Sequence, residues 1–202
     1  MNDPSALEQL KQRLDALESK DDIRALVTAY GVACDEHDLH RLVDLFTEDA
    51  EFTAPNGAMA ALGRQAIEEM YINTFRIRGP SYHWTHDVVI DISPDNPDRA
   101  TGLVLSHAET SPDGVVSIAA MRYADEYQRG SDRVWRFARR EITFLYYTPV
   151  TEFSSVLNNL ERVTMGGAKH PADFPERLDV WKEFSNNYSH DNSETKEASR
   201  DD

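Results

Sequence analysis

Residues 21–57 read DDIRALVTAYGVACDEHDLHRLVDLFTEDAEFTAPNG, and this stretch decides the fold. Apolar residues recur at helical spacing in its first half: Ile23, Leu26, Val27 and Tyr30. Asp38 then has the side chain of a helix cap, and a short apolar stripe follows it. EDAEFTA, residues 48–54, is typical of a strand, and Pro55-Asn56-Gly57 of a turn. The stretch therefore predicts two helices that lead into a sheet.

The flanking segments extend this pattern in both directions. Leucines at spacings of three and four predict an earlier helix: Leu7, Leu10, Leu14 and Leu17. Ser19, with Asp22 three residues on, resembles a capping signal, so we expect a second helix to begin there. On the other side, residues 63–78 predict a helix that ends at Gly79-Pro80.

Beyond Pro80 the pattern changes to strands. Four segments have strand composition and are separated by turn residues: 81–92, 99–109, 114–129 and 133–147. Helices followed by a meander of strands indicate an α+β domain with the helices on one sheet face. After Pro149 the pattern weakens, and we expect short helices around 155–163 and 176–184.

These patterns divide the chain into three parts. We expect a domain over residues 1–150, including the N-terminal helical extension. Residues 151–188 form a C-terminal segment that we expect to be helical and to cover a pocket. Residues 189–202 are acidic and nearly free of apolar side chains, so we expect disorder there.

Composition limits the classes of function. The chain has 202 residues, a net charge of −15, and 21 Lys and Arg dispersed among 36 acidic residues, which disfavours binding to nucleic acid. The sequence contains no apolar run long enough to span a membrane, and its N-terminus lacks the pattern of a secretory signal. The single cysteine, Cys34, cannot form an internal disulfide. We therefore expect a cytoplasmic protein.

Several polar side chains are candidates for chemistry. Asp35 ends the second predicted helix, His83 and His86 open a long strand, His107 lies on the next strand, and Arg140 lies mid-strand. Each also has a purely structural interpretation, as a helix cap, a core or surface histidine, or a surface ion pair. Their combination favours a site, because a histidine base needs a partner that fixes its tautomer and stabilises its charged form. A buried aspartate does both.

Strand alternation leaves open which histidine faces the interior. His83 and His86 are three residues apart, so a regular strand turns them to opposite faces. His86 shares a face with Val88 and Ile90, which favours His86 as the inward residue. A β-bulge at the start of the strand would turn His83 inward instead.

The order of these segments resembles a known family. The pattern L-F-x-x-D-A-x-F is matched by Leu45, Phe46, Asp49, Ala50 and Phe52. Together with GRQAIEEMY (63–71), YHWTHDVVIDI (82–92) and RYADEYQRGSDRVWRFARREI (122–142), it resembles SnoaL-like proteins of the nuclear transport factor 2-like superfamily. The resemblance covers residues 19–149. It implies a cone-shaped α+β barrel of the cystatin-like type, with N-terminal helices on a strongly curved, mainly antiparallel sheet.

The resemblance also implies a function. Lyases of this superfamily use a His/Asp pair without metal or organic cofactor, and the matching positions are His83 and Asp35. Arg140 and Tyr30 match further catalytic positions, and His107 falls near another. The implied activity is a cofactor-independent lyase or isomerase, of dehydratase or dehydrohalogenase type, that abstracts a proton from a hydrophobic small molecule. We expect four residues to bind that substrate: Trp84, His86, Leu105 and Met121.

Two alternatives stay open, since one fold serves many functions. The first is a polyketide or terpenoid cyclase that uses the same pocket, with Asp35 or His107 as acid and base. The second is a non-catalytic ligand-binding or assembly module without a dyad. We also expect a homo-oligomer, a trimer as in the lyase relatives or a dimer, because the outward sheet face carries Val116, Ile118 and Ala120.

Overall fold

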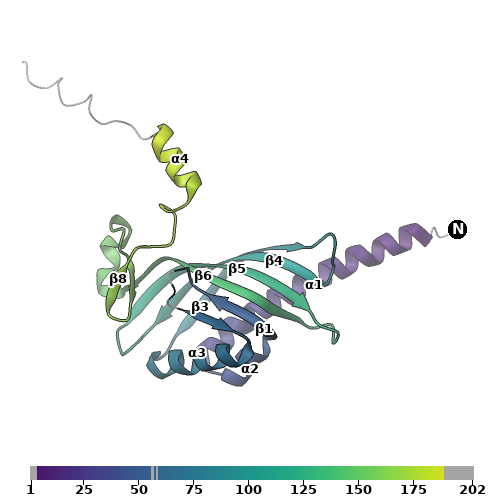
Figure 1. Ribbon diagram of the computed structural model, residues 1–202, viewed down its shortest axis with the longest axis horizontal. Coiled ribbons are helices and arrows are strands. Elements are labelled where there is room, and N and C mark those ends of the chain that lie inside the picture. Colours follow the sequence, from purple (N-terminus) through teal and green to yellow (C-terminus); the bar gives the residue numbers. More distant parts are fainter. Residues whose placement is uncertain (1–3, 56, 58, 189–202) are drawn as a thin grey trace, which may run out of the picture.

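A computed structural model describes residues 4–55, 57 and 59–188 of the chain. The helices of the first half of the chain, residues 4–77, lie against the concave side of one curled sheet, whereas the C-terminal helix projects away from it (Figure 1). The helices are α1 (Pro4–Asp35), α2 (Leu39–Asp44), α3 (Arg64–Ile77) and α4 (Asp179–Tyr188), with a 3₁₀ helix, η1 (Val150–Asn158). The long strands are β1 (Phe46–Thr53), β3 (Tyr82–Ile92), β4 (Arg99–Thr110), β5 (Ser117–Arg129) and β6 (Trp135–Pro149). The short strands are β2 (Ala60–Leu62), β7 (Val163–Met165) and β8 (Ala168–His170).

The strands form one sheet in the order β2–β1–β6–β5–β4–β3, with β7 beside β6 and β8 beside β7. The pairs β1–β6 and β6–β7 are parallel, and the other pairs are antiparallel. Strands β3 to β6 follow one another as a meander. This arrangement confirms the α+β fold with helices on one sheet face and the cone-shaped architecture that the resemblance implied.

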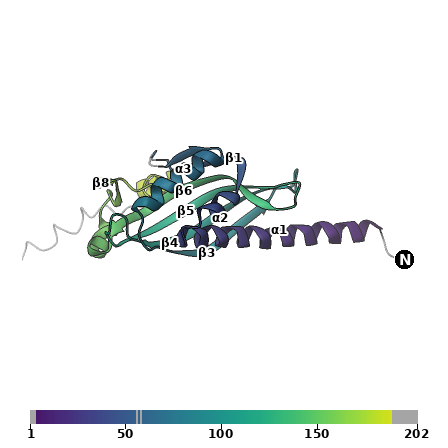
Figure 2. The same ribbon diagram turned by 90° about the horizontal axis from the view of Figure 1, so that it is seen from below.

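Helix α1 corrects one expectation, because it is a single helix of 32 residues rather than two. Ser19 is buried, and its hydroxyl accepts a hydrogen bond from Arg129 Nη1 (3.1 Å) instead of capping a helix. Since residues 5–30 contain neither glycine nor proline, their backbone hydrogen bonds continue without a break. The N-terminal part of α1 extends past the sheet (Figure 2), and its leucine stripe is exposed: Leu7, Leu10, Leu14 and Leu17.

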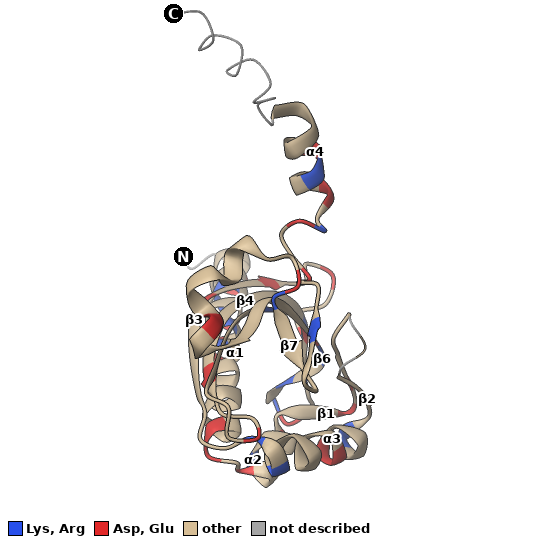
Figure 3. Cartoon of the chain, turned by 90° about the vertical axis from the view of Figure 1, so that its left-hand side faces the viewer, with Lys and Arg blue, Asp and Glu red and all other residues tan. Residues whose placement is uncertain are grey.

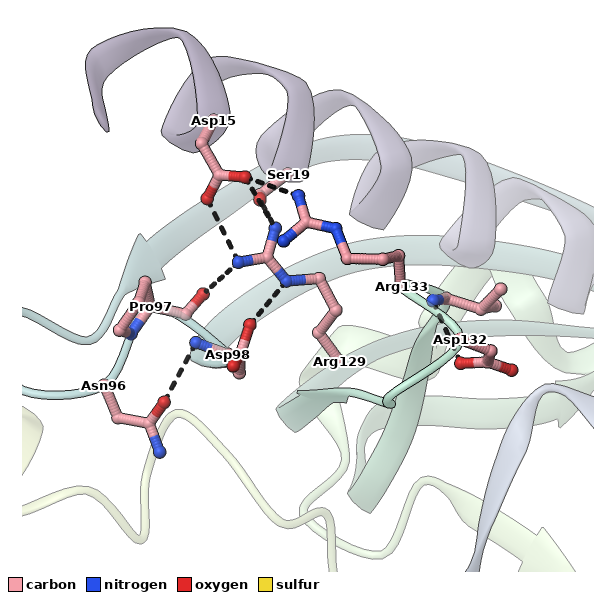
Figure 4. Close-up of polar contacts among 9 residues, drawn as sticks. Asp15, Ser19, Asn96, Pro97, Asp98, Arg129, Asp132 and Arg133 are labelled. Carbon is pink, nitrogen blue, oxygen red and sulfur yellow. Dashed lines mark hydrogen bonds and ion pairs between the residues drawn. The ribbon is translucent and has the colours of Figure 1, made fainter. Parts of the chain in front are cut away.

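A cluster of ion pairs holds α1 on the sheet (Figure 4). Arg129, the last residue of β5, donates to both carboxylate oxygens of Asp15 (3.0 Å each) and to Asp98 Oδ1 (2.6 Å). Arg133 also donates to Asp15 Oδ1 (2.6 Å). Hydrogen bonds from both arginines lower the pKa of Asp15. The cluster joins residues 114 positions apart in the sequence.

Two small residues lie in a row of four that crosses the inner sheet face near the ends of its strands. His83, Ala108, Ala119 and Tyr147 lie opposite one another on β3, β4, β5 and β6. Both alanines are buried, and their short side chains leave space between the sheet and the helices. Asp38 caps α2 as predicted, because its carboxylate accepts the Arg41 N–H at 3.0 Å.

The segment after β6 differs from the prediction in detail. η1 covers residues 150–158 in place of a helix over 155–163, the β7–β8 hairpin was not expected, and α4 spans 179–188 rather than 176–184. The predicted acidic tail, 189–202, lies outside the described residues.

Part of the outer sheet face is covered by η1. Its Val156 packs with Ala120 and Tyr146 in a small apolar cluster. Of the three residues that motivated the expected oligomer, Ala120 is therefore buried within the chain, Ile118 is half-buried, and Val116 is exposed.

Charged side chains are dispersed along the described chain (Figure 3). In the ranges that the structure describes, no helix is both long and apolar enough to cross a membrane.

Candidate active site

A cavity of about 60 Å³ lies between the inner sheet face and the helices. Most of its wall is apolar, from Phe52, Met59, Ala119, Met121, Ile142, Phe144 and Met165. Polar groups enter the wall through His83, Tyr30 and Arg78. Met165 comes from β7, so the C-terminal segment contributes to the cavity. A mostly apolar cavity with a few convergent polar groups is the usual form of a small-molecule site.

His83 and Asp35 form a tight pair in this region. Asp35 is the last residue of α1, and His83 is the second residue of β3. His83 Nδ1 lies 2.6 Å from Asp35 Oδ1, and the backbone N–H of His83 donates to Asp35 Oδ2 at 2.9 Å. These two contacts fix the ring, and because Nδ1 is engaged, Nε2 is the nitrogen that remains for chemistry.

The approach of α1 to β3 makes this contact possible. A Cβ atom added at Gly31 would lie 3.5 Å from the Cβ of His83, so helix and strand are in close contact there. Asp35 is about one helical turn further along α1, and its carboxylate therefore reaches the histidine ring.

The surroundings of Asp35 favour the ionised form of its carboxyl group. Burial opposes its ionisation, but hydrogen bonds from the ring and backbone N–H of His83, together with Ser81, lower the pKa of its carboxyl below the ordinary value. The side chains of Asp35 and His83 are only 16% and 7% exposed, so solvent screens their interaction weakly. An ionised Asp35 therefore places a negative charge directly beside the His83 ring.

A β-bulge decides between the two strand histidines. Thr85 and Val88 of β3 lie opposite Ser106 and Val104 of β4. The step along β3 is three residues and the step along β4 is two, so β3 contains one extra residue at this point. The extra residue turns His83 to the same inner face as Val88, which regular alternation does not allow. His83 lines the cavity, whereas His86 is exposed on the outer face.

Three further residues expected at the site lie outside the cavity. Leu105 and His107 are exposed on the outer face of β4, and Trp84 is 51% exposed on β3. His107 Nδ1 lies 2.8 Å from His86 Nε2, so these histidines bond each other instead of a ligand in the cavity. We therefore correct the expectation that His86, Leu105 and His107 line the pocket, because outward strand positions place them on the opposite side of the sheet. Trp84 does border an open groove of about 450 Å³ between α1 and β3, together with Asp35 and His83.

Two expected residues do line the cavity. The hydroxyl of Tyr30 lies 2.6 Å from that of Tyr71, and burial raises the pKa of Tyr30 well above its ordinary value. Met121 accepts a hydrogen bond from the Tyr123 hydroxyl at its sulfur (3.3 Å). Both side chains shape the wall near His83.

Arg140 lies beneath the cavity rather than in it. It is fully buried and donates two hydrogen bonds to the carboxylate of Asp125, at 2.8 and 2.7 Å. Its guanidinium lies 4.1 Å from the ring of Tyr30, and a void of about 10 Å³ borders Arg140, Tyr30 and His83. Arg140 therefore supports the residues of the wall, and its charge is already balanced by Asp125.

The sequence analysis missed three polar residues of the cavity. Arg78 follows the last residue of α3, and its side chain lines the cavity. Thr110 and Tyr147 also line it and share a hydrogen bond of 2.8 Å between their hydroxyls. Arg78 stands at the end of a helix, where a basic residue is ordinary. Arg76, two residues earlier, is basic as well, so nothing in the sequence marked Arg78.

The described chain offers little to other chemistries. In residues 4–188, apart from the undescribed positions 56 and 58, no three His, Cys, Asp or Glu side chains gather to hold a metal ion. Cys34 is buried, and burial raises the pKa of its thiol to about 11, so it stays protonated at neutral pH.

Comparisons with solved structures support the fold. Hexachlorocyclohexane dehydrochlorinase LinA type 2 is similar with a TM-score of 0.63 and 22% identity, over 68% of this chain and 93% of that one. LinA type 3 from Novosphingobium barchaimii LL02 gives 0.62 and 22%, over 68% and 94%. ActVI-ORFA from Streptomyces coelicolor gives 0.54 and 19%, over 63% and 98%.

Comparisons of sequence identify the family. Among curated proteins, no sequence matches this chain. The SnoaL-like domain, however, matches residues 15–141, which is more than half of the chain and includes α1 from Asp15 onward and the strands as far as the middle of β6. The chain therefore belongs to the SnoaL-like family.

Proposed function

We propose that the protein is a lyase or isomerase that abstracts a proton from carbon with His83. The observation that carries the proposal is the 2.6 Å contact between His83 Nδ1 and Asp35 Oδ1 beside an apolar cavity. A role as a helix cap would explain Asp35 alone, and a role as a core histidine would explain His83 alone. Neither role explains why the two side chains meet at a cavity wall. The structural similarity to a dehydrochlorinase is consistent with elimination chemistry.

The roles follow from the geometry. His83 Nε2 takes the proton, and Asp35 stabilises the imidazolium that results. In an elimination, the electron pair of the broken C–H bond forms the new double bond, and the leaving group departs with its own bonding pair. In an isomerisation, the protonated His83 returns the proton to another carbon. Tyr30 shapes the wall next to the ring.

The size of the cavity limits the reacting part of the substrate. A volume of about 60 Å³ admits a small group. Met59 and Met165 line it, and because unbranched thioether side chains adapt easily, they let the cavity widen around a larger hydrophobic molecule.

Hydrogen–deuterium exchange tests proton abstraction before the leaving group is known. A panel of small carbon acids, including β-hydroxy and β-halo carbonyl compounds, is incubated with the protein in D₂O and followed by NMR. We expect exchange or elimination with at least one compound. His83→Ala and Asp35→Asn should each lower the rate by about 10²- to 10⁴-fold, the usual contribution of a general base.

His86→Ala is the matched control, because His86 is a histidine of the same strand that faces outward. It should leave the rate unchanged. The proposal fails if the wild-type protein exchanges no proton across the panel, or if His83→Ala and His86→Ala behave alike.

A further inference from the structure

Arg78 brings a guanidinium to the cavity from a firmly held backbone position. Its own N–H donates to the carbonyl of Thr74 (3.0 Å), and its strand-like backbone pairs with Pro112 in the β4–β5 loop. The next residue, Gly79, donates to the carbonyl of Ser111 at 3.3 Å. The backbone of Arg78 is thus anchored to both α3 and the β4–β5 loop, and its side chain lines the cavity wall.

Among the described residues, no counter-ion accompanies this charge. Within the part of the chain that the structure describes, the Arg78 guanidinium makes no hydrogen bond or ion pair. The ionisable groups that influence it most are Cys34, Tyr147, Tyr30 and Tyr71. Burial raises the pKa of the Cys34 thiol to about 11. It also raises the pKa values of Tyr30 and Tyr71 well above the ordinary value of a tyrosine, so these three groups are neutral at physiological pH.

The buried arginines of this protein show how unusual that is. Arg129 binds Asp15 and Asp98, Arg140 binds Asp125, and Arg162 binds Glu176 at 2.9 and 2.7 Å. These are the arginines that are buried in the described ranges, and each has a carboxylate. Arg78 is half-buried, and a guanidinium partly withdrawn from water without an anion carries a desolvation cost that is typical of a group kept for a ligand.

The rest of the wall defines the ligand. Thr110 and Tyr147 add two hydroxyls near Arg78, and the remaining wall is apolar. Tyr147 is also in the inner-face row of His83, with two alanines between them. A ligand that satisfies all of these groups has an anionic head on a small apolar body, with a carbon of that body between Arg78 and His83.

We propose that the cavity binds a small apolar carboxylate, with Arg78 as its counter-ion. Arg78 is then a substrate-binding residue that sets which carbon faces His83. The identification of this carboxylate as the substrate rests on the proposed function, whereas the binding itself does not.

Calorimetric titration tests the binding directly. Butyrate and benzoate are the probes, and butyramide and benzamide are neutral analogues of nearly the same shape. We expect the carboxylates to bind and the amides to bind about tenfold to a hundredfold more weakly, as for the loss of a hydrogen bond to a charged group. Arg78→Met should weaken carboxylate binding by a similar factor and leave amide binding unchanged.

Three variants make the test specific. Arg76→Met removes an exposed arginine two residues earlier, on α3, and should bind the probes like the wild type. Ala119→Leu should abolish binding of both probes, because the added side chain fills the cavity. His83→Ala should still bind carboxylates even though it lacks proton abstraction, which separates failure of the proposed function from failure of this site.

Stability gives a second readout. Arg78→Met removes an unpaired charge, so its melting temperature should equal or exceed that of the wild type. The proposal is overturned if carboxylates bind no better than amides, if Arg78→Met and Arg76→Met bind alike, or if Arg78→Met lowers the melting temperature, as loss of a structural arginine would.

Discussion

The pair of Arg140 and Asp125 is predicted to be among the costliest single interactions to break in this fold. The two residues lie directly opposite each other on β5 and β6, and their side chains are 1% and 0% exposed. Two hydrogen bonds of 2.8 and 2.7 Å join them, and Tyr127 donates a third to Asp125 (2.8 Å). Gly102, opposite Asp125 on β4, leaves room for Tyr127, because a Cβ there would lie 2.9 Å from its ring.

The substitution Asp125→Asn keeps the shape of the side chain and removes its charge. Arg140 cannot lose its own proton, so it becomes an uncompensated buried cation, and the free energy of unfolding should fall by about 3–5 kcal/mol. Adding Arg140→Met to Asp125→Asn should cost about 1–3 kcal/mol less than the sum of the single changes, because the second substitution removes the orphaned charge.

Urea denaturation at pH 7, followed by circular dichroism, measures these energies. Asp132→Asn is the matched control, since Arg136 also donates two hydrogen bonds to Asp132, at 3.1 and 2.8 Å, but the aspartate is half exposed. That change should have little effect. The reasoning is refuted if Asp125→Asn destabilises the protein no more than Asp132→Asn, or if the single changes at Asp125 and Arg140 are additive.

Two further predictions concern the ion pairs of α1. Because the folded pKa of Asp35 lies below its unfolded value of about 4, the pair with His83 stabilises the fold above that pH and loses its effect as the pH falls further. The difference in unfolding free energy between wild type and Asp35→Asn should therefore shrink below about pH 4 in urea titrations, and a constant difference from pH 7 to pH 3 contradicts this. Arg129→Gln should lower stability by about 1.5–3 kcal/mol and speed amide exchange in α1, whereas Arg133→Gln, at a side chain 67% exposed, should do neither. Equal effects of these two variants would show that burial does not decide the strength of the cluster.

The fold was predictable because the sequence segments that form its main strands are long. The four strands of the meander each span eleven or more residues, and alternation over that length leaves little ambiguity. β7 and β8 have three residues each, too few for alternation to be recognised. The break expected at Ser19 rested on local spacing, whereas the true partner of its hydroxyl, Arg129, lies 110 residues away. Local sequence carries no information about such a contact.

The candidate site was predictable in part. The end of a helix and the start of a strand located Asp35 and His83, and the resemblance paired them. The choice between His83 and His86 depends on one inserted residue in β3, which shows only in the register with β4. Arg78 gave no signal, since what distinguishes it is the absence of a carboxylate partner among the described residues, and that is a property of the folded chain.

The placement of Leu105 and His107 shows why hydrophobicity is a poor guide to the inner face of β4. The outer face of this strand carries Leu103 and Leu105, while the inner face carries Val104, Ser106 and Ala108. The larger apolar residues would ordinarily mark the buried side. In this sheet the inner side must accommodate α1, the His83 ring and a cavity, so its residues become smaller along the strand toward Ala108, opposite His83. The same requirement explains the bulge that turns His83 inward and the alanine at position 119. The positions at which ordinary strand rules fail are thus neighbours in space, and they are the positions that make room for a ligand.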